Sequence, residues 1–143
     1  MAYLDHIGIA VQVNSPLAKA LGLLGVACSG SEKVASEKVD TEWFPLPAVK
    51  SAAPNLSGTS IELLRPTDPE SVIGKFLAKS GRDGVHHLSF RVSDLGAMMK
   101  KFEAAGFRFV YPSPKPGAHN CVVNFLHPST TGGVLLELTE KRG

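Results

Sequence analysis

The stretch Gly84-Val85-His86-His87-Leu88-Ser89-Phe90-Arg91-Val92 decides how the rest of the sequence is interpreted. From His87 onward apolar residues alternate with small or polar ones, which is the pattern of a half-buried strand. Because successive side chains of a strand point to opposite faces, His87 shares a face with Ser89 and Arg91, and the apolar residues cover the other face. A histidine on a face of small and polar side chains can reach a ligand.

The same pattern opens the chain. Asp5-His6-Ile7-Gly8-Ile9-Ala10-Val11 aligns with residues 86–92 without a gap, so that His6 corresponds to His87. A glycine follows each of these histidines by 19 residues, after a helix-like run, and each half closes on an apolar strand with one carboxylate, Glu62 or Glu137. This repeat predicts two copies of one module, each a strand, a helix and several further strands.

Composition predicts an ordinary globular protein without nucleic-acid or membrane partners. The 143 residues suffice for one domain, and a net charge of +2 without clustered Lys and Arg does not favour nucleic acid. No apolar run reaches the roughly 18 residues of a membrane span, and the N-terminus leads directly into a strand, so we expect a cytoplasmic protein. Cys28 and Cys121 are far apart and are expected to be free thiols.

We expect one domain over residues 1–143, with modules at about 1–66 and 85–143 joined by a linker helix at about 67–80. The remaining elements follow from local composition: strands at 26–34, 39–46, 107–110 and 121–126, and loops at 47–57 and 112–120. Lys75 and Lys79 lie four residues apart on one face of the linker helix. They form either a solvated face or an anion-binding edge for a phosphate-bearing substrate.

Two histidines and two carboxylates in equivalent places of a repeat predict a metal centre. Divalent cations take imidazole and carboxylate ligands and leave positions open for substrate. A single histidine or glutamate in a strand is more often an ordinary core or surface residue, but four in matched places are hard to attribute to chance. His86 should point away from His87, and His127, before a proline in a turn, is expected to be a loop hydrogen-bonder.

The sequence resembles the vicinal-oxygen-chelate superfamily, which has the glyoxalase and extradiol-dioxygenase fold, and within it the methylmalonyl-CoA epimerases. The resemblance covers nearly the whole chain. It is carried by Leu4–Val11, by Ile61-Glu62-Leu63-Leu64-Arg65-Pro66, by Phe76–His87, by Phe125-Leu126-His127-Pro128 and by Gly132–Leu138.

This resemblance implies an α+β fold in which paired βαβββ modules form a cupped, curved mixed sheet. It also implies a divalent metal ion (Co, Mn, Zn or Ni) held by His6, Glu62, His87 and Glu137. The epimerase pattern often has Gln at the position of Glu62, which leaves the subfamily open.

In such epimerases the metal binds the carboxylate and thioester oxygens of the substrate, so that an enolate can form. Two carboxylates on opposite sides of the α-carbon then exchange its proton. By this resemblance Glu137 is one of the two carboxylates and Glu42 the other. Substrate contacts are expected at Gly117, His119 and Asn120 in the proline-rich loop.

The implied partner is an acyl-CoA thioester, and the almost uncharged first helix favours a homodimer. Three alternatives are weighed against the epimerase: a lactoylglutathione lyase, an Fe(II) extradiol dioxygenase and a metal-free binding module of the same fold. Retention of all four candidate ligands argues against the binding module.

Overall fold

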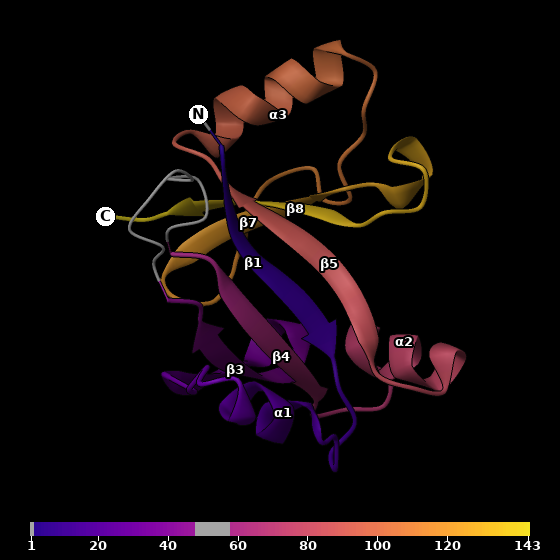
Figure 1. Ribbon diagram of the computed structural model, residues 1–143. Helices are drawn as coiled ribbons and strands as arrows, with labels where there is room; N and C mark the ends of the chain where they lie inside the picture. Colours follow the sequence, from indigo (N-terminus) through magenta and orange to yellow (C-terminus); the bar gives the residue numbers. More distant parts are fainter. Residues whose placement is uncertain (1, 48–57) are drawn as a thin grey trace. The chain divides into compact units, whose positions relative to one another are not determined.

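The computed structural model describes residues 2–47 and 58–143, and the chain path is drawn in Figure 1. The described strands follow the order β2-β3-β4-β1 in the N-terminal half and β5-β8-β7-β6 in the C-terminal half, and each half forms a mixed sheet. Their bounds are β1 Tyr3–Ala10, β2 Gly30–Val34, β3 Val39–Pro45, β4 Ser60–Pro66, β5 Gly84–Arg91, β6 Lys115–Pro116, β7 Cys121–Leu126 and β8 Leu136–Lys141. The helices are α1 Leu17–Leu23, α2 Val72–Ser80 and α3 Leu95–Ala104, with short 3-10 turns η1 Ala35–Glu37 and η3 Pro128–Thr130.

The chain divides into two compact units, which we describe separately. The N-terminal unit is His6–His86, and the C-terminal unit combines Met1–Asp5 with His87–Gly143. The linker helix α2 belongs to the N-terminal unit. It begins at Ser71, whose Oγ accepts a hydrogen bond from Gly74 N at 3.0 Å, and ends at Gly81 in the left-handed conformation.

The two units repeat one strand topology, as the sequence predicts. In the N-terminal unit β1 runs parallel to β4, and β4, β3 and β2 then pair antiparallel in turn. In the C-terminal unit β5 runs parallel to β8, followed by antiparallel β7 and β6. The expectation of an α+β fold with a mixed sheet from paired βαβββ modules is confirmed, whereas the single-domain assignment stays a prediction.

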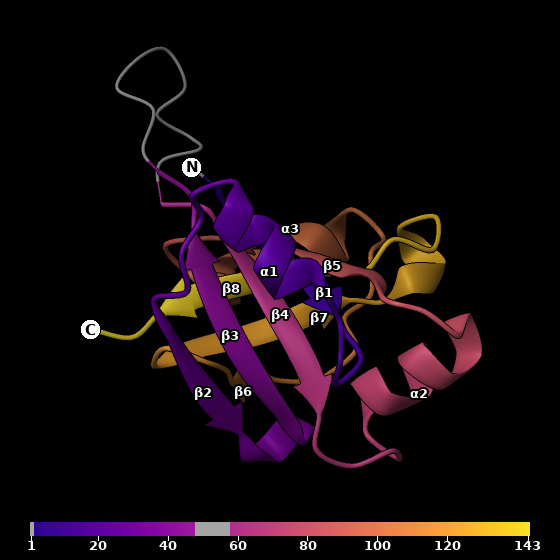
Figure 2. The same ribbon diagram turned by 60° about the horizontal axis from the view of Figure 1, so that its bottom comes forward.

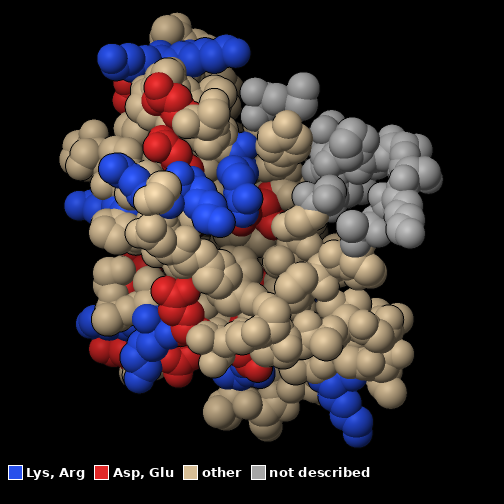
Figure 3. Space-filling model, turned by 90° about the vertical axis from the view of Figure 1, so that its left-hand side faces the viewer, with Lys and Arg blue, Asp and Glu red and all other residues tan. Residues whose placement is uncertain are grey.

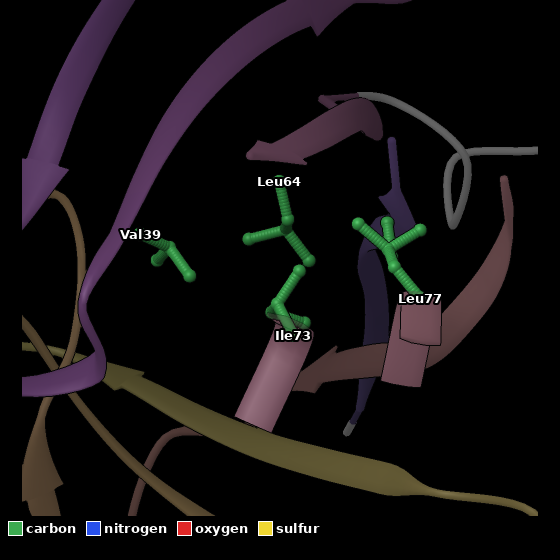
Figure 4. Packing of buried hydrophobic residues seen from close by; sticks show 5 residues of the cluster. Val39, Leu64, Ile73 and Leu77 are labelled. Carbon is green, nitrogen blue, oxygen red and sulfur yellow. The ribbon is translucent and has the colours of Figure 1, made fainter. Parts of the chain in front are cut away.

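Strand alternation gives the N-terminal unit two distinct faces. We call the face of His6, Thr41, Trp43, Glu62 and Leu64 the His6 face, and the opposite one the α1 face. On the α1 face Phe44 and Leu63 pack with Leu17 and Leu21 of α1, which crosses these strands in Figure 2. On the His6 face α2 covers only one end, where Ile73 and Leu77 pack with Val39 and Leu64 (Figure 4). The rest of the His6 face keeps its polar side chains.

The C-terminal unit has the corresponding pair of faces. His87, Ser89, Phe125 and Glu137 share what we call the His87 face. The opposite face carries a buried cluster with α3, formed by Val92, Leu95, Met99 and Leu138. Asp94 begins this helix, because its Oδ1 accepts a hydrogen bond from Ala97 N at 2.8 Å.

Three local predictions need correction. Residues 107–110 form no strand: only Phe109 pairs, in an isolated bridge to Leu126. The short strand β6 instead lies at Lys115–Pro116, inside the expected loop, where Pro114 and Pro116 limit its length. The second strand begins at Gly30 rather than Val26, because Gly25 in the left-handed conformation first turns the chain out of α1. Most of the loop expected at 47–57 lies outside the described residues.

Candidate metal centre

His6 and Glu62 form the polar group of the N-terminal unit. Both side chains are buried, and His6 Nε2 lies 3.6 Å from Glu62 Oε2. Two ligand atoms at about 2.0–2.2 Å from one cation are themselves about 3–3.5 Å apart. The separation and burial of this pair therefore suit two neighbouring ligands of one metal ion.

The strand register explains why this pair meets. In the parallel β1–β4 pair Glu62 lies beside Gly8, two residues from His6 on the same face. Trp43 lies opposite Glu62 on β3 and meets the His6 ring edge to face, with centroids 5.0 Å apart and an interplanar angle of 87°. This packing restrains the imidazole orientation.

The C-terminal unit repeats this arrangement with two substitutions. His87 and Glu137 are buried, and Glu137 lies beside Ser89, which takes the place of Gly8. The Ser89 hydroxyl donates a hydrogen bond to Glu137 Oε1 at 2.6 Å. Phe125 lies opposite Glu137 and meets the His87 ring edge to face, with centroids 6.0 Å apart.

Trp43 and Phe125 are site residues that sequence reasoning missed. Each stands opposite the carboxylate of its own half and against the histidine of that half. Extending the repeat beyond the histidines and carboxylates to the antiparallel partner strands is the signal that could have found them.

Two imidazoles and one carboxylate of the described residues make a buried donor set, His6, Glu62 and His87, that could hold a metal ion. This set has the ligand types that Zn, Co, Mn and Ni accept. Glu137 offers a further carboxylate on the face of His87, and Ser89 restrains one of its two oxygens. The chemistry of the residues thus fits the expected group.

The structure separates Glu42 from this group. Glu42 lies opposite Leu63 in the β3–β4 register, so its side chain is on the α1 face, away from His6 and Glu62. There it forms an ion pair with Arg65, and both side chains are partly exposed. Neither its face nor its partner supports the role of second base that the resemblance implied.

The expected substrate contacts have ordinary structural surroundings. Lys75 and Lys79 are exposed on α2, and Lys75 Nζ lies 3.8 Å from Glu70 Oε2. The other three, Gly117, His119 and Asn120, form the turn between β6 and β7. His119 and Asn120 both have φ of 55°, and a Cβ at Gly117 would lie 2.8 Å from Val123 Cγ1, so turn geometry explains these residue types.

The two histidines left out of the ligand set are placed as expected. His86 packs edge to face on Phe76, with centroids 5.1 Å apart, and burial lowers the pKa of His86 to about 4. His127 caps η3, because its Nδ1 accepts a hydrogen bond from Ser129 N at 3.2 Å.

The surface charge and the lengths of the helices agree with the predictions made from the composition. On the face shown in Figure 3, Lys and Arg are interspersed with Asp and Glu. None of the helices within residues 2–47 and 58–143 is long and apolar enough to cross a bilayer. The absence of a nucleic-acid partner stays a prediction.

Comparison with known proteins gives the family. Residues 5–125 match the model of the glyoxalase/bleomycin resistance protein/dioxygenase superfamily, and the chain belongs to that superfamily. Within it, the chain is similar to methylmalonyl-CoA epimerases. It is 34% identical to the mitochondrial methylmalonyl-CoA epimerase of Homo sapiens, over 96% of this chain and 73% of that protein.

Other similar proteins and solved structures are also named as methylmalonyl-CoA epimerases. The ethylmalonyl-CoA/methylmalonyl-CoA epimerase of Cereibacter sphaeroides is 32% identical, over 96% of both chains. The mitochondrial methylmalonyl-CoA epimerase of Dictyostelium discoideum is 44% identical, over 60% of this chain and 52% of its own length. The crystal structure of methylmalonyl-CoA epimerase from Mycobacterium tuberculosis superposes with a TM-score of 0.87 at 35% identity, covering 99% of this chain and 89% of that one. A methylmalonyl-CoA epimerase in complex with methylmalonyl-CoA and NH4+ has a TM-score of 0.87 at 28% identity, over 100% and 96% of the two chains.

Proposed function

We propose that this protein is a metal-dependent epimerase that interconverts the stereoisomers of methylmalonyl-CoA by moving the α-proton. The observation that carries the proposal is the buried histidine–glutamate group in each half of a chain whose near-full-length relatives are methylmalonyl-CoA epimerases. The solved structures to which the chain is similar include methylmalonyl-CoA epimerases as well.

The proposed ligands of a single divalent cation (Co, Mn, Zn or Ni) are His6, Glu62, His87 and Glu137. Burial keeps water from competing with substrate oxygens, and the aromatic partners Trp43 and Phe125 restrain the two imidazoles. When bound, the cation supplies positive charge where negative charge develops on the thioester oxygen, which makes the α-proton acidic enough for a carboxylate to remove.

Glu137 is the proposed base. Its carboxylate takes the α-proton from one face of the substrate, and the electron pair of the broken C–H bond passes to the thioester oxygen as an enolate. Ser89 holds Glu137 Oε1 at 2.6 Å, so the second oxygen keeps a defined direction. Delivery of a proton to the opposite face of the α-carbon then produces the other epimer.

The proposed partner is an acyl-CoA thioester. The CoA phosphates carry negative charge, and Lys75 and Lys79 on α2 stay candidates for them because both are exposed on one helix face. The homodimer and the cytoplasmic location stay predictions.

The test is epimerisation of a single stereoisomer of methylmalonyl-CoA, followed by NMR, with chelator-stripped protein before and after adding Co²⁺ or Mn²⁺. We expect inversion that requires the metal. Metal binding without inversion, combined with turnover of the methylglyoxal–glutathione hemithioacetal, would replace the proposal with a lactoylglutathione lyase. Absence of metal binding would favour a binding module.

A further inference from the structure

The C-terminal unit carries a row of rings on its His87 face. The His87 ring meets Phe125 with centroids 6.0 Å apart, and Phe125 meets Tyr111 with centroids 6.4 Å apart. The Lys115 ammonium lies over the Tyr111 ring, with Nζ 5.6 Å from the centroid. We call Phe125, Tyr111 and Lys115 the Tyr111 row. It leads from a proposed metal ligand to a positive charge, and all of its residues belong to one compact unit.

Hydrogen bonds fix Tyr111 against the strand β7. Val110 N donates to the Phe125 carbonyl at 2.8 Å. The fully buried Asn124 accepts a hydrogen bond from Tyr111 N at 3.2 Å through Oδ1, and donates one to the Tyr111 carbonyl at 2.9 Å through Nδ2. One buried side chain thus pairs both polar groups of the Tyr111 main chain. The half-buried Tyr111 ring is therefore held in a defined place beside Phe125.

The strand register puts Lys115 on the same face but far from the metal ligand. Lys115 is opposite Val123 in the β6–β7 pair, and Val123 lies two residues from Phe125, so all three share a face. The strand β6 is three strand spacings from β5, which carries His87, and three spacings amount to about 14 Å. The exposed Lys115 can therefore meet a ligand group that is remote from the reacting centre.

A CoA thioester has its groups in the order of this row, and the match rests on the proposed function. The acyl group reacts beside the metal ligands, the pantetheine arm is a chain of methylene and amide groups, and the phosphates follow at its far end. Aromatic faces pack against such an arm, and an ammonium group pairs with phosphate oxygens. A substrate carboxylate beside His87 is too distant for Lys115, whereas a phosphate is not.

The matching place of the N-terminal unit carries the opposite charge. Glu32 stands opposite Thr41 in the β2–β3 pair, as Lys115 stands opposite Val123 in the β6–β7 pair. A carboxylate repels phosphate where an ammonium attracts it. Lys75 of α2 has a carboxylate nearby, since its Nζ lies 3.8 Å from Glu70 Oε2, while the contact of Lys115 is an aromatic ring. Charge therefore favours the C-terminal unit as the place of the CoA phosphates.

We propose that the CoA arm of the substrate lies along the His87 face of the C-terminal unit. Its pantetheine part packs on Phe125 and Tyr111, and one of its phosphates pairs with the Lys115 ammonium. Lys115 thus determines affinity for the CoA carrier and takes no part in proton transfer.

The experiment compares a substrate that has phosphates with one that lacks them. Epimerisation of methylmalonyl-CoA and of methylmalonyl-pantetheine is measured with the Co²⁺-loaded wild type, Lys115→Gln, Lys115→Arg, Tyr111→Leu and Tyr111→Phe. Calorimetry gives the Kd of free CoA for each protein, and metal content and thermal unfolding are measured on every variant. Lys100→Gln is the matched control, because it removes an exposed lysine from α3, on the opposite face of the same unit.

We expect Lys115→Gln to raise the KM for methylmalonyl-CoA and the Kd of free CoA about fivefold or more, with kcat within about twofold. Its kinetics with the pantetheine thioester should not change, since that substrate has no phosphate. Lys115→Arg should recover most of the affinity. Tyr111→Leu should weaken both thioesters about threefold, because both carry the pantetheine arm, and Tyr111→Phe should retain them. Lys100→Gln should change neither.

Unchanged KM and Kd for the CoA ligands in Lys115→Gln would overturn the inference, as would an equal loss for both thioesters. A loss of CoA affinity in Lys75→Gln or Lys79→Gln instead would place the phosphates at α2. A wild type that binds CoA through Lys115 but does not invert methylmalonyl-CoA would contradict the proposed function and leave this inference standing. A wild type that inverts the substrate with equal KM for both thioesters would contradict this inference alone.

Discussion

The two halves of the molecule place a histidine and a glutamate in the same register but differ at the residue beside the glutamate. Glu62 lies beside Gly8, and Glu137 lies beside Ser89. In the N-terminal half the carboxylate lies 3.6 Å from His6, whereas in the C-terminal half it accepts a hydrogen bond from a serine hydroxyl at 2.6 Å. One duplicated glutamate thus has an imidazole as its close neighbour, and the other has a hydroxyl that sets its direction.

This difference suggests different roles for the equivalent residues Glu62 and Glu137. A metal ligand needs only an oxygen at the correct distance from its neighbours, but a base must direct a lone pair at one hydrogen of the substrate. The hydroxyl beside Glu137 provides such direction, and the glycine beside Glu62 does not. We therefore propose that Glu62 serves in metal binding alone and that Glu137 serves in both metal binding and proton transfer.

The largest expected effect comes from making the same substitution in both halves. Glu137→Gln should lower kcat for epimerisation by about 10²–10⁴-fold, because an amide cannot take a proton, while Glu62→Gln should cost less than about tenfold, because an amide oxygen can still ligate. Steady-state kinetics of both metal-loaded variants measure the contrast. Equal losses of kcat in the two variants would contradict different roles for Glu62 and Glu137.

A smaller effect is expected from Ser89→Ala, which makes the C-terminal half resemble the N-terminal one. The carboxylate of Glu137 would lose its buried hydrogen bond, so kcat should fall about tenfold with KM nearly unchanged. Ser89→Thr, which keeps the hydroxyl, should recover part of kcat. A rise in KM without a change in kcat would show that Ser89 acts on substrate binding instead.

The adjacent residues His86 and His87 allow a similar comparison for stability. The folded-state pKa of His86 is about 4, against 6.5 for the ordinary side chain. The unfolded chain therefore takes up the proton first as the pH falls, and stability is lost from about pH 6.5 down to about pH 4.

His86→Phe should remove this loss. Urea unfolding of the metal-free protein at pH 7 and pH 5 should show the wild type losing about 2 kcal/mol more than the variant between the two pH values. A variant that loses as much stability as the wild type would show that His86 does not titrate in this way.

The repeat made the strand pairing and the positions of the candidate ligands predictable from the sequence. Matched alternation around His6 and His87, and matched carboxylates at Glu62 and Glu137, need only the period of a strand. The parallel pairing of β1 with β4 and of β5 with β8 then follows the order that the repeat implies. The same alternation predicted that His86 and His87 point to different faces.

The position of Glu42 could not be predicted in the same way. Its face depends on the antiparallel register of β3 against β4, and a slip of one residue moves every side chain to the other face. That register is set by pairing between distant residues, with Trp43 opposite Glu62, and no local pattern in residues 39–46 reveals it. The prediction of a strand at residues 107–110 was wrong for a related reason. Their alternating pattern is typical of a strand, but only Phe109 pairs, with Leu126.

We propose that both halves contribute ligands to one cation, and the metal stoichiometry tests this proposal. The chelator-stripped protein is reconstituted with Co²⁺ and its metal content is measured for the wild type, His6→Ala, His87→Ala and the control His86→Phe. We predict one Co²⁺ per chain in the wild type and in His86→Phe, and none in either of the other variants. Two ions per chain in the wild type, or full occupancy after loss of either His6 or His87, would contradict a shared centre.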